Sequence, residues 1–235
     1  RAGIKYTVNE KQSLSLGYGL HSQIQPIGVY FAEVSDSSGK VFTPNKNLEL
    51  TKSHHVVLGY DRMLKPWLHV KLEAYYQQLF DVPVGTDTSE NFSILNLRDG
   101  YATDPLVNKG LGQNYGLELT FEQYLHNDLY FLLSSSVYNS TYKALDDKWR
   151  NTLFNSNYAF TFTAGKEFKT GAKFRNRIIG ANIKVVYAGG LRKTPIDIEK
   201  SIAEGTTYYF EDRAFSEQYP AYFRTDIRVS MKRNR

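Results

Sequence analysis

The sequence predicts an all-β protein: an antiparallel transmembrane β-barrel, seen here as about nine strands of a larger barrel. Three observations predict it. Apolar and polar residues alternate strictly in short stretches, the connections between these stretches are alternately short and long, and no helical segment is available to cover a sheet. A strand has a period of two, so alternation gives it one apolar and one polar face. Repeated strand after strand, this pattern indicates lipid outside and a polar lumen inside.

Residues 68–77 show the alternation best. One face would carry Leu68, Val70, Leu72, Ala74 and Tyr76, and the other His69, Lys71, Glu73, Tyr75 and Gln77. A soluble β-sandwich also alternates. It would not usually place charges in such regular register opposite a bare apolar face, with long loops on one side only.

Composition fits a barrel and excludes several other classes. Mean hydropathy is −0.45, and no run approaches the roughly 18 apolar residues that a membrane helix needs. The 18 Tyr and 14 Phe suit strands and interfacial belts. The lack of Cys excludes a disulfide scaffold and a zinc–thiolate site. Lys and Arg are scattered, so the net charge of +5 does not indicate a nucleic-acid partner.

The strands are expected in four pairs and a ninth strand. The pairs are 3–9 with 13–22, 49–61 with 67–80, 113–124 with 129–140, and 157–168 with 178–188, and the ninth strand is 222–232. Short turns join the pairs, at Glu10 to Gln12, Met63 to Pro66, His126 to Asp128 and Lys169 to Arg177. Long loops, 23–48, 81–112, 141–156 and 189–221, separate them. In bacterial barrels short turns are periplasmic and long loops extracellular, which sets one orientation for the chain.

Aromatic residues near the strand ends support this orientation. Tyr60, Trp67, Tyr124 and Phe168 are expected at the periplasmic rim, and Phe80, Tyr138, Tyr158, Tyr187 and Phe223 at the outer rim. Nine strands cannot close neatly, because single-chain bacterial barrels have even strand numbers. We therefore expect the sequence to be the C-terminal part of a bigger barrel.

Several short motifs occur in an order and spacing that suggest a family. They are NYGLELT (114–120), YFLLS (130–134), STYK (140–143), WRNT (149–152), AGKE (164–167), YAGG (187–190), TPID (194–197) and YFRTDIRVS (222–230). Together they resemble the C-terminal barrel portion of TonB-dependent outer-membrane receptors of the Bacteroidetes type.

The resemblance implies a 22-stranded barrel in a Gram-negative outer membrane, plugged by an N-terminal domain. It also implies active uptake of a bulky nutrient, powered through the inner-membrane TonB complex. The plug, the TonB-contacting segment and the final strand would lie outside residues 1–235. Receptors of this branch often work with a surface lipoprotein, which would be a further partner. The ligand stays open among glycan, peptide, siderophore and vitamin.

Two groups of residues are candidates for function. Inward-facing charges would line the lumen and contact the plug or one another: Lys71, Glu73, Glu118, Glu122, Arg224, Asp226 and Arg228. Aromatic residues of the long loops would either hold a ligand at the barrel mouth or pack the loops together: Tyr30, Phe31, Phe92, Tyr101, Trp149, Tyr208, Tyr209 and Phe210.

Metal and catalytic sites are not expected. His54 and His55 would point to opposite faces of a strand and cannot ligate one metal together. Asp146 and Asp147 could bind Ca²⁺, although a solvated acidic turn is the simpler interpretation. Motifs for a serine hydrolase, a zinc protease and a P-loop are absent, so neither an enzyme nor a cofactor is predicted. Two alternatives stay open: a passive porin or scaffold barrel, and a soluble β-rich carbohydrate-binding module.

Overall fold

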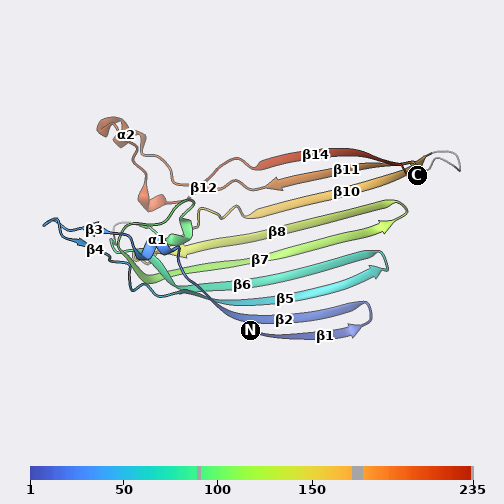
Figure 1. Cartoon of the computed structure of the whole chain (residues 1–235), viewed down its shortest axis with the longest axis horizontal. Coiled ribbons are helices and arrows are strands. Elements are labelled where there is room, and N and C mark those ends of the chain that lie inside the picture. The colour runs from blue at the N-terminus through green and yellow to red at the C-terminus, as the bar shows by residue number, and fades with distance from the viewer. Residues whose placement is uncertain (89–90, 171–176, 234–235) are drawn as a thin grey trace.

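The computed structural model describes residues 1–88, 91–170 and 177–233. Nine long strands form one open antiparallel sheet in which strands that follow one another along the chain are neighbours (Figure 1). They are β1 (Ala2–Asn9), β2 (Gln12–Gln23), β5 (Thr51–Lys65), β6 (Leu68–Gly85), β7 (Leu106–His126), β8 (Leu129–Lys143), β10 (Tyr158–Thr170), β11 (Arg177–Ala188) and β14 (Tyr222–Arg233). The predicted all-β fold with nine main strands is confirmed.

The remaining elements are short and lie in the long connections, gathered at one end of the sheet (Figure 1). They are α1 (Ile27–Tyr30), β3 (Val34–Ser35), β4 (Val41–Phe42), η1 (Ile94–Asn96), β9 (Trp149–Asn151), β12 (Arg192–Lys193), α2 (Ile198–Glu204), η2 (Glu211–Arg213) and β13 (Glu217–Gln218). Within the described residues, none of the helices has the length and apolar character to cross a membrane.

Two of the short turns show how tightly the hairpins close. Asn127 and Asp128 join β7 to β8 with φ of 52° and 60°, the positive values that a two-residue type I′ turn requires. The turn between β5 and β6 is formed by Pro66 and Trp67, because pairing continues to Lys65 opposite Leu68. The predicted turn from Met63 to Pro66 therefore begins too early in the sequence, because Met63 and Lys65 still pair with β6. The predicted turn from Lys169 to Arg177 falls largely on 171–176, outside the described residues.

The β6–β7 hairpin extends well beyond the predicted strand end at Phe80. Asp81 adopts a φ of 54°, and the pairing shifts register there before it resumes at Val82 with Gly110 and Pro83 with Asn108. Such an irregularity lets a strand bend and continue past residues that would otherwise end it. The predicted loop 81–112 is thus wrong at both ends, and the connection between the strands is 86–105.

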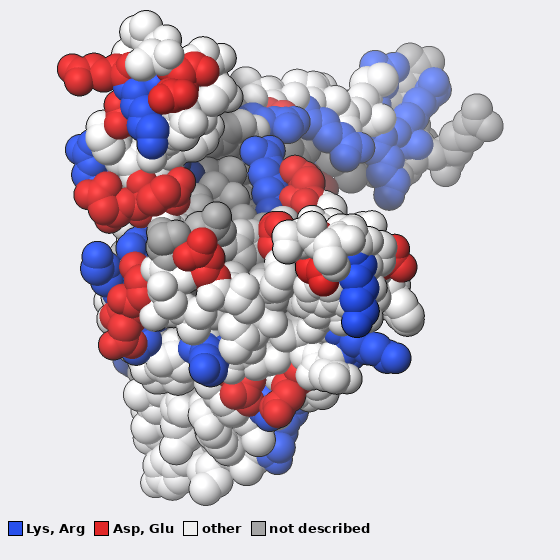
Figure 2. Space-filling model, turned by 90° about the vertical axis from the view of Figure 1, so that its left-hand side faces the viewer, with Lys and Arg blue, Asp and Glu red and all other residues white. Residues whose placement is uncertain are grey.

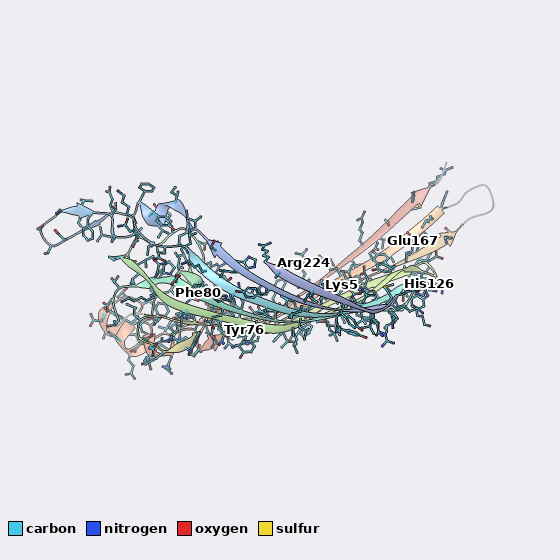
Figure 3. All side chains as sticks on the ribbon, turned by 90° about the horizontal axis from the view of Figure 1, so that it is seen from below. Lys5, Tyr76, Phe80, His126, Glu167 and Arg224 are labelled. Atoms are coloured by element: carbon cyan, nitrogen blue, oxygen red, sulfur yellow. The ribbon has the colours of Figure 1, made fainter. Side chains whose placement is uncertain are left out.

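The register places the alternating residues on two distinct faces. Leu72 pairs with Leu119 on one face, and Glu73 pairs with Glu118 on the other. The sheet is bowed, with Tyr76 on its convex side and Arg224 on its concave side (Figure 3). We call the concave side the lumen wall and the convex side the lipid face. Tyr138, predicted at the lipid-facing outer rim, instead lies on the lumen wall beside Gly116 and Tyr75.

Buried residues gather where the long loops meet, at the outer end of the sheet. One cluster contains Val29, Ala102 and Leu106, and a second contains Val84, Tyr142 and Ala144. A fully buried amide joins two of the loops: Asn45 donates to the Asp104 carbonyl at 2.9 Å and accepts from the Leu106 amide at 2.8 Å. The loops therefore form a packed layer of their own, which positions the side chains at the mouth.

Candidate functional site at the loop layer and the lumen wall

The charged residues predicted to face inward lie on the lumen wall, and several bond to each other. Lys71 Nζ lies 2.7 Å from Glu73 Oε2, and Arg224 Nη2 lies 2.8 Å from Asp226 Oδ1. Both pairs join residues two apart on one strand, as side chains on a shared face permit.

Glu122 belongs to a group around a histidine. His69 Nε2 lies 3.0 Å from Asp61 Oδ2, and His69 Nδ1 lies 3.8 Å from Glu122 Oε2. The Nδ1 atom is buried and makes no hydrogen bond within the described residues. Glu118 lies opposite Glu73 in the register, and Arg228 lies opposite Asn182.

The predicted loop aromatics do not form one cluster. Phe31, Tyr101 and Trp149 are exposed, with Trp149 under the Lys143 ammonium at 5.9 Å. Tyr30 accepts a hydrogen bond from the Gln25 amide, and Phe92 packs against the cluster around Val29. These contacts are loop packing.

The longest loop holds the other three aromatics. Lys200 Nζ lies 4.2 Å above the Tyr208 ring, and the Arg213 guanidinium lies 4.1 Å above Phe210. A cation above an aromatic ring is attracted to the face of the ring. Lys200 and Arg213 therefore cover one face of Tyr208 and of Phe210, respectively. Tyr209 is about half exposed and lines an open hollow.

This hollow, of about 700 Å³, lies between the 189–221 loop and the 86–105 loop. Its lining residues are Asn91, Arg98, Leu153, Leu191, Arg192, Lys193, Thr194, Pro195, Ile196, Ile198, Tyr209, Glu211, Phe215, Glu217 and Tyr219. A second hollow of about 370 Å³ adjoins it and shares Asn91, Arg98, Glu211 and Phe215. The volume suits a small-molecule or short-peptide ligand.

Most polar groups of the hollow already have partners in the protein. Asn91 donates to Glu211 Oε2 at 2.7 Å, and Arg192 Nε donates to the Asn155 carbonyl at 2.9 Å. Lys193 lies 3.3 Å from Glu217. By contrast, the Arg98 side chain is 70% exposed, and its one ion pair within the described residues is with Asp99, at 3.7 Å. Among the residues that the structure describes around it, the hollow thus combines an apolar and aromatic wall with one exposed cation, Arg98.

Arg98 and Glu211 were not among the predicted site residues. They lie 113 positions apart in the sequence, in loops without periodicity. These loops meet through the hydrogen bonds of Asn91 to Glu211 and through Leu95 and Phe215, which pack against one buried cluster. No pattern in the sequence indicates that contact.

The two carboxylates of the Asp146–Asp147 turn differ in exposure, since the Asp147 side chain is 83% exposed and the Asp146 side chain only 16%. Arg150 Nη1 donates to Asp146 Oδ1 at 2.9 Å, and Lys143 binds Asp147. The hydrogen bond from Arg150 lowers the pKa of Asp146 below its usual value. Each carboxylate is therefore paired with a nearby cation, and the interpretation as a solvated turn holds for Asp147 but not for Asp146.

The histidine pair behaves as strand geometry requires. His54 stacks on Phe80 on the lipid face, with ring centroids 5.1 Å apart, whereas His55 lies near His21 and Tyr75 on the lumen wall. Throughout the described ranges, no three His, Asp or Glu side chains are placed to hold a metal ion.

Comparisons with known proteins agree with this architecture. The family model "TonB dependent receptor-like, beta-barrel" matches residues 1–234. Among solved structures, the FrpB iron transporter from Neisseria meningitidis (F3-3 variant) superposes with a TM-score of 0.54 at 13% sequence identity. That match covers 96% of this chain and 30% of the transporter chain, so it shows the shared fold over part of a larger barrel. No curated protein matches the sequence.

Proposed function

This chain belongs to the TonB-dependent receptor β-barrel family, and we propose that the complete protein is a TonB-dependent importer. The chain resides in the outer membrane of a Gram-negative cell, as predicted. That location rules out the alternative of a soluble carbohydrate-binding module. The Bacteroidetes type stays a prediction, since neither comparison tests it.

The proposed importer captures a bulky nutrient at the loop layer and passes it through the barrel. The observation that carries this proposal is the open hollow above the lumen wall, between the 86–105 and 189–221 loops. Its apolar wall offers contact area, and Arg98 offers a charge that orients a ligand. Residues 1–235 would form the C-terminal barrel portion. The N-terminal plug, the TonB complex and a surface lipoprotein are the proposed partners, and we assign the protein no catalysis and no cofactor.

The neighbouring structure's cargo does not transfer to this chain. FrpB is an iron transporter, but 13% identity supports only a shared fold. For the present protein we propose only that the ligand fits a partly apolar hollow in which Arg98 supplies a positive charge.

Conductance of the full-length protein in planar bilayers tests import against passive diffusion. A plugged importer stays closed without treatment and opens when urea displaces the plug. Steady conductance of untreated protein would support the alternative of a passive porin and contradict the proposal.

The hollow is tested in cells whose growth depends on the full-length protein. We expect Tyr209→Ala with Arg98→Gln to slow that growth, because the pair removes both the exposed ring and the available cation. Phe42→Ala is the matched control, an exposed loop aromatic that lies outside the hollow. Equal growth of the two variants, at equal protein levels, would contradict ligand capture at this site.

A further inference from the structure

The lipid face and the lumen wall of the sheet carry different charges. In the regularly paired stretches of the long strands, the carboxylates alternate onto the lumen wall: Asp61, Glu73, Glu118, Glu122, Glu167 and Asp226. At the end of the sheet with the short turns, the lipid face carries cations instead: Arg62, Lys166, Arg177 and Arg233. That end is periplasmic in the orientation that the loops indicate. Positive charge is therefore placed on the outside of the barrel at its periplasmic rim.

Arg177 and Arg233, which we call the arginine pair, are the two closest of these cations in the register. They lie directly opposite each other on β11 and β14, so their Cα atoms are about 5 Å apart. Both residues are exposed, and within the described residues neither forms an ion pair. Like charges directly opposite each other destabilise a sheet. An anion bound by both guanidinium groups would remove that cost.

An apolar row adjoins the arginine pair on the same face. Phe168, Ile179 and Met231 are cross-strand neighbours, two residues nearer to the middle of the membrane than the row that contains the pair. All three side chains are exposed. In Figure 2, basic side chains gather at the far upper edge of the molecule, where Figure 1 places the ends of β10, β11 and β14. This surface thus combines two cations at the strand ends with an apolar row towards the bilayer core.

The other cations at this rim have partners or face the lumen. Lys166 Nζ donates to the Asn127 carbonyl in the β7–β8 turn, at 2.7 Å. Lys169 lies on the lumen wall and is bound to Asp128 at 2.6 Å. Lys232 alternates onto the lumen wall as well. Among the described residues of β10, β11 and β14, the arginine pair is therefore the part of the lipid-facing rim that offers unpaired positive charge.

We propose that the arginine pair binds the phosphate of an anionic phospholipid in the periplasmic leaflet, and that the acyl chains of this lipid lie along the apolar row. The planar guanidinium group of arginine suits this role, because it donates paired hydrogen bonds to phosphate oxygens. Basic residues at a membrane surface favour lipids with a net negative charge, such as phosphatidylglycerol, over zwitterionic ones. The proposal requires the outer-membrane location of the chain but not import, so it goes beyond the proposed function.

Native mass spectrometry of the full-length protein in detergent tests the proposal. Phosphatidylglycerol and phosphatidylcholine with the same acyl chains are the probes, and the bound fraction at each lipid concentration gives a dissociation constant. The variant Arg177→Gln with Arg233→Gln removes the arginine pair. Lys184→Gln with Arg228→Gln is the matched control, since it also removes one cation from each of β11 and β14, but on the lumen wall. Heat-modifiability in detergent confirms that each protein is folded.

We expect wild type and control to bind phosphatidylglycerol more tightly than phosphatidylcholine. Loss of the arginine pair should weaken phosphatidylglycerol binding about tenfold, as for two cations near an anionic headgroup, and should leave phosphatidylcholine binding unchanged. An unchanged affinity for phosphatidylglycerol in this variant, or an equal loss in the control, would overturn the proposal. Equal affinity of wild type for the two lipids would overturn it as well.

Two further measurements cover a misfolded double variant and a soluble ligand. Arg233→Gln alone changes the exposed last residue of β14, and we expect it to weaken phosphatidylglycerol binding about threefold. Wild-type affinity in this variant would contradict the proposal. Glycerol phosphate, which has the phosphate without the acyl chains, should not displace the lipid. Displacement would show that the arginine pair binds soluble phosphates, and the lipid site would be refuted.

Discussion

Arg150 and Asp146 form a two-pronged ion pair at the outer end of the sheet. Arg150 Nη1 donates to Asp146 Oδ1 at 2.9 Å, and Nη2 donates to Oδ2. Their side chains are only 8% and 16% exposed. Bidentate hydrogen bonds between an arginine and a carboxylate are among the stronger hydrogen bonds in proteins. The pair fixes the loop between β8 and β10, which contributes Leu153 to the hollow.

Replacing Arg150 by Ala should destabilise this loop by about 3 kcal/mol, because it leaves a nearly buried carboxylate without its partner. Hydrogen exchange of the 144–157 amides in the detergent-purified protein measures the effect. The double variant Arg150→Ala with Asp146→Ala should recover part of the loss. Exchange rates like those of wild type in the single variant would show that the pair contributes no stability.

The same pair predicts how the loop responds to acid. The pKa of Asp146 is lowered in the folded protein, chiefly by the Arg150 hydrogen bond. The stabilisation is therefore fully present above the unfolded value of about 3.9, and it is lost as pH falls through the lower, folded value. Loop protection should be constant from neutral pH to about pH 5 and decline below about pH 4. A decline of the same size in Asp146→Asn would assign it to another group.

Leu72 and Leu119 are cross-strand neighbours on the lipid face. Leu72→Arg or Leu119→Arg should cost roughly 2–4 kcal/mol, as for arginine at the bilayer midplane in other barrels. Lys71→Ala and Glu118→Ala, one residue away on the lumen wall, should cost much less. Urea unfolding in lipid vesicles measures all four. Equal costs at the two sets of positions would contradict the assigned faces.

Two adjacent glycines at the outer end of β11 permit close backbone contacts. A Cβ on Gly189 would lie 1.8 Å from the Ser156 carbonyl oxygen, and one on Gly190 would lie 2.1 Å from the Tyr219 carbonyl oxygen. We expect Gly189→Ala to displace the loops around the hollow and to increase their cleavage by protease. Gly17→Ala is the control, since its Cβ would approach nothing closer than 4.0 Å. Similar cleavage of both variants would argue against the close approach.

A buried amide joins the first two long loops. Asn45→Ala should destabilise their packing by about 2 kcal/mol, because the Leu106 amide and the Asp104 carbonyl lose their partner in a buried setting. Hydrogen exchange of the Leu106 amide reports the loss directly. An unchanged rate at Leu106 would show that the loops are held together without this side chain.

The sequence predicted the features that repeat along it. Alternation in 113–124 assigned the faces of β7. Polar residues such as Glu118 and apolar residues such as Leu119 take turns along this segment, so each kind falls on its own face. Asn127 and Asp128 marked a hairpin because few residues adopt positive φ readily. Both signals are local, so one sequence is enough to detect them.

Features that depend on distant contacts could not be predicted. Pro83 and Gly85 suggested a loop, yet pairing of Pro83 with Asn108 and of Gly85 with Leu106 keeps both residues within β6. The contact between Asn91 and Glu211 brings two loops together across 120 positions. Loops lack the period that identifies a face, and ion pairs such as Arg150 with Asp146 depend on the turn between them. The hollow therefore became visible only in three dimensions.

Spin labels placed one at a time at positions 68–77 of the full-length protein in lipid vesicles test the central claim, that alternate side chains face hydrocarbon. Their accessibility to oxygen, which concentrates in lipid, and to a water-soluble nickel chelate is measured. The account predicts oscillation with a period of two, with oxygen maxima at Leu68, Val70, Leu72, Ala74 and Tyr76. Accessibility without that period, or nickel maxima at these five positions, would contradict it.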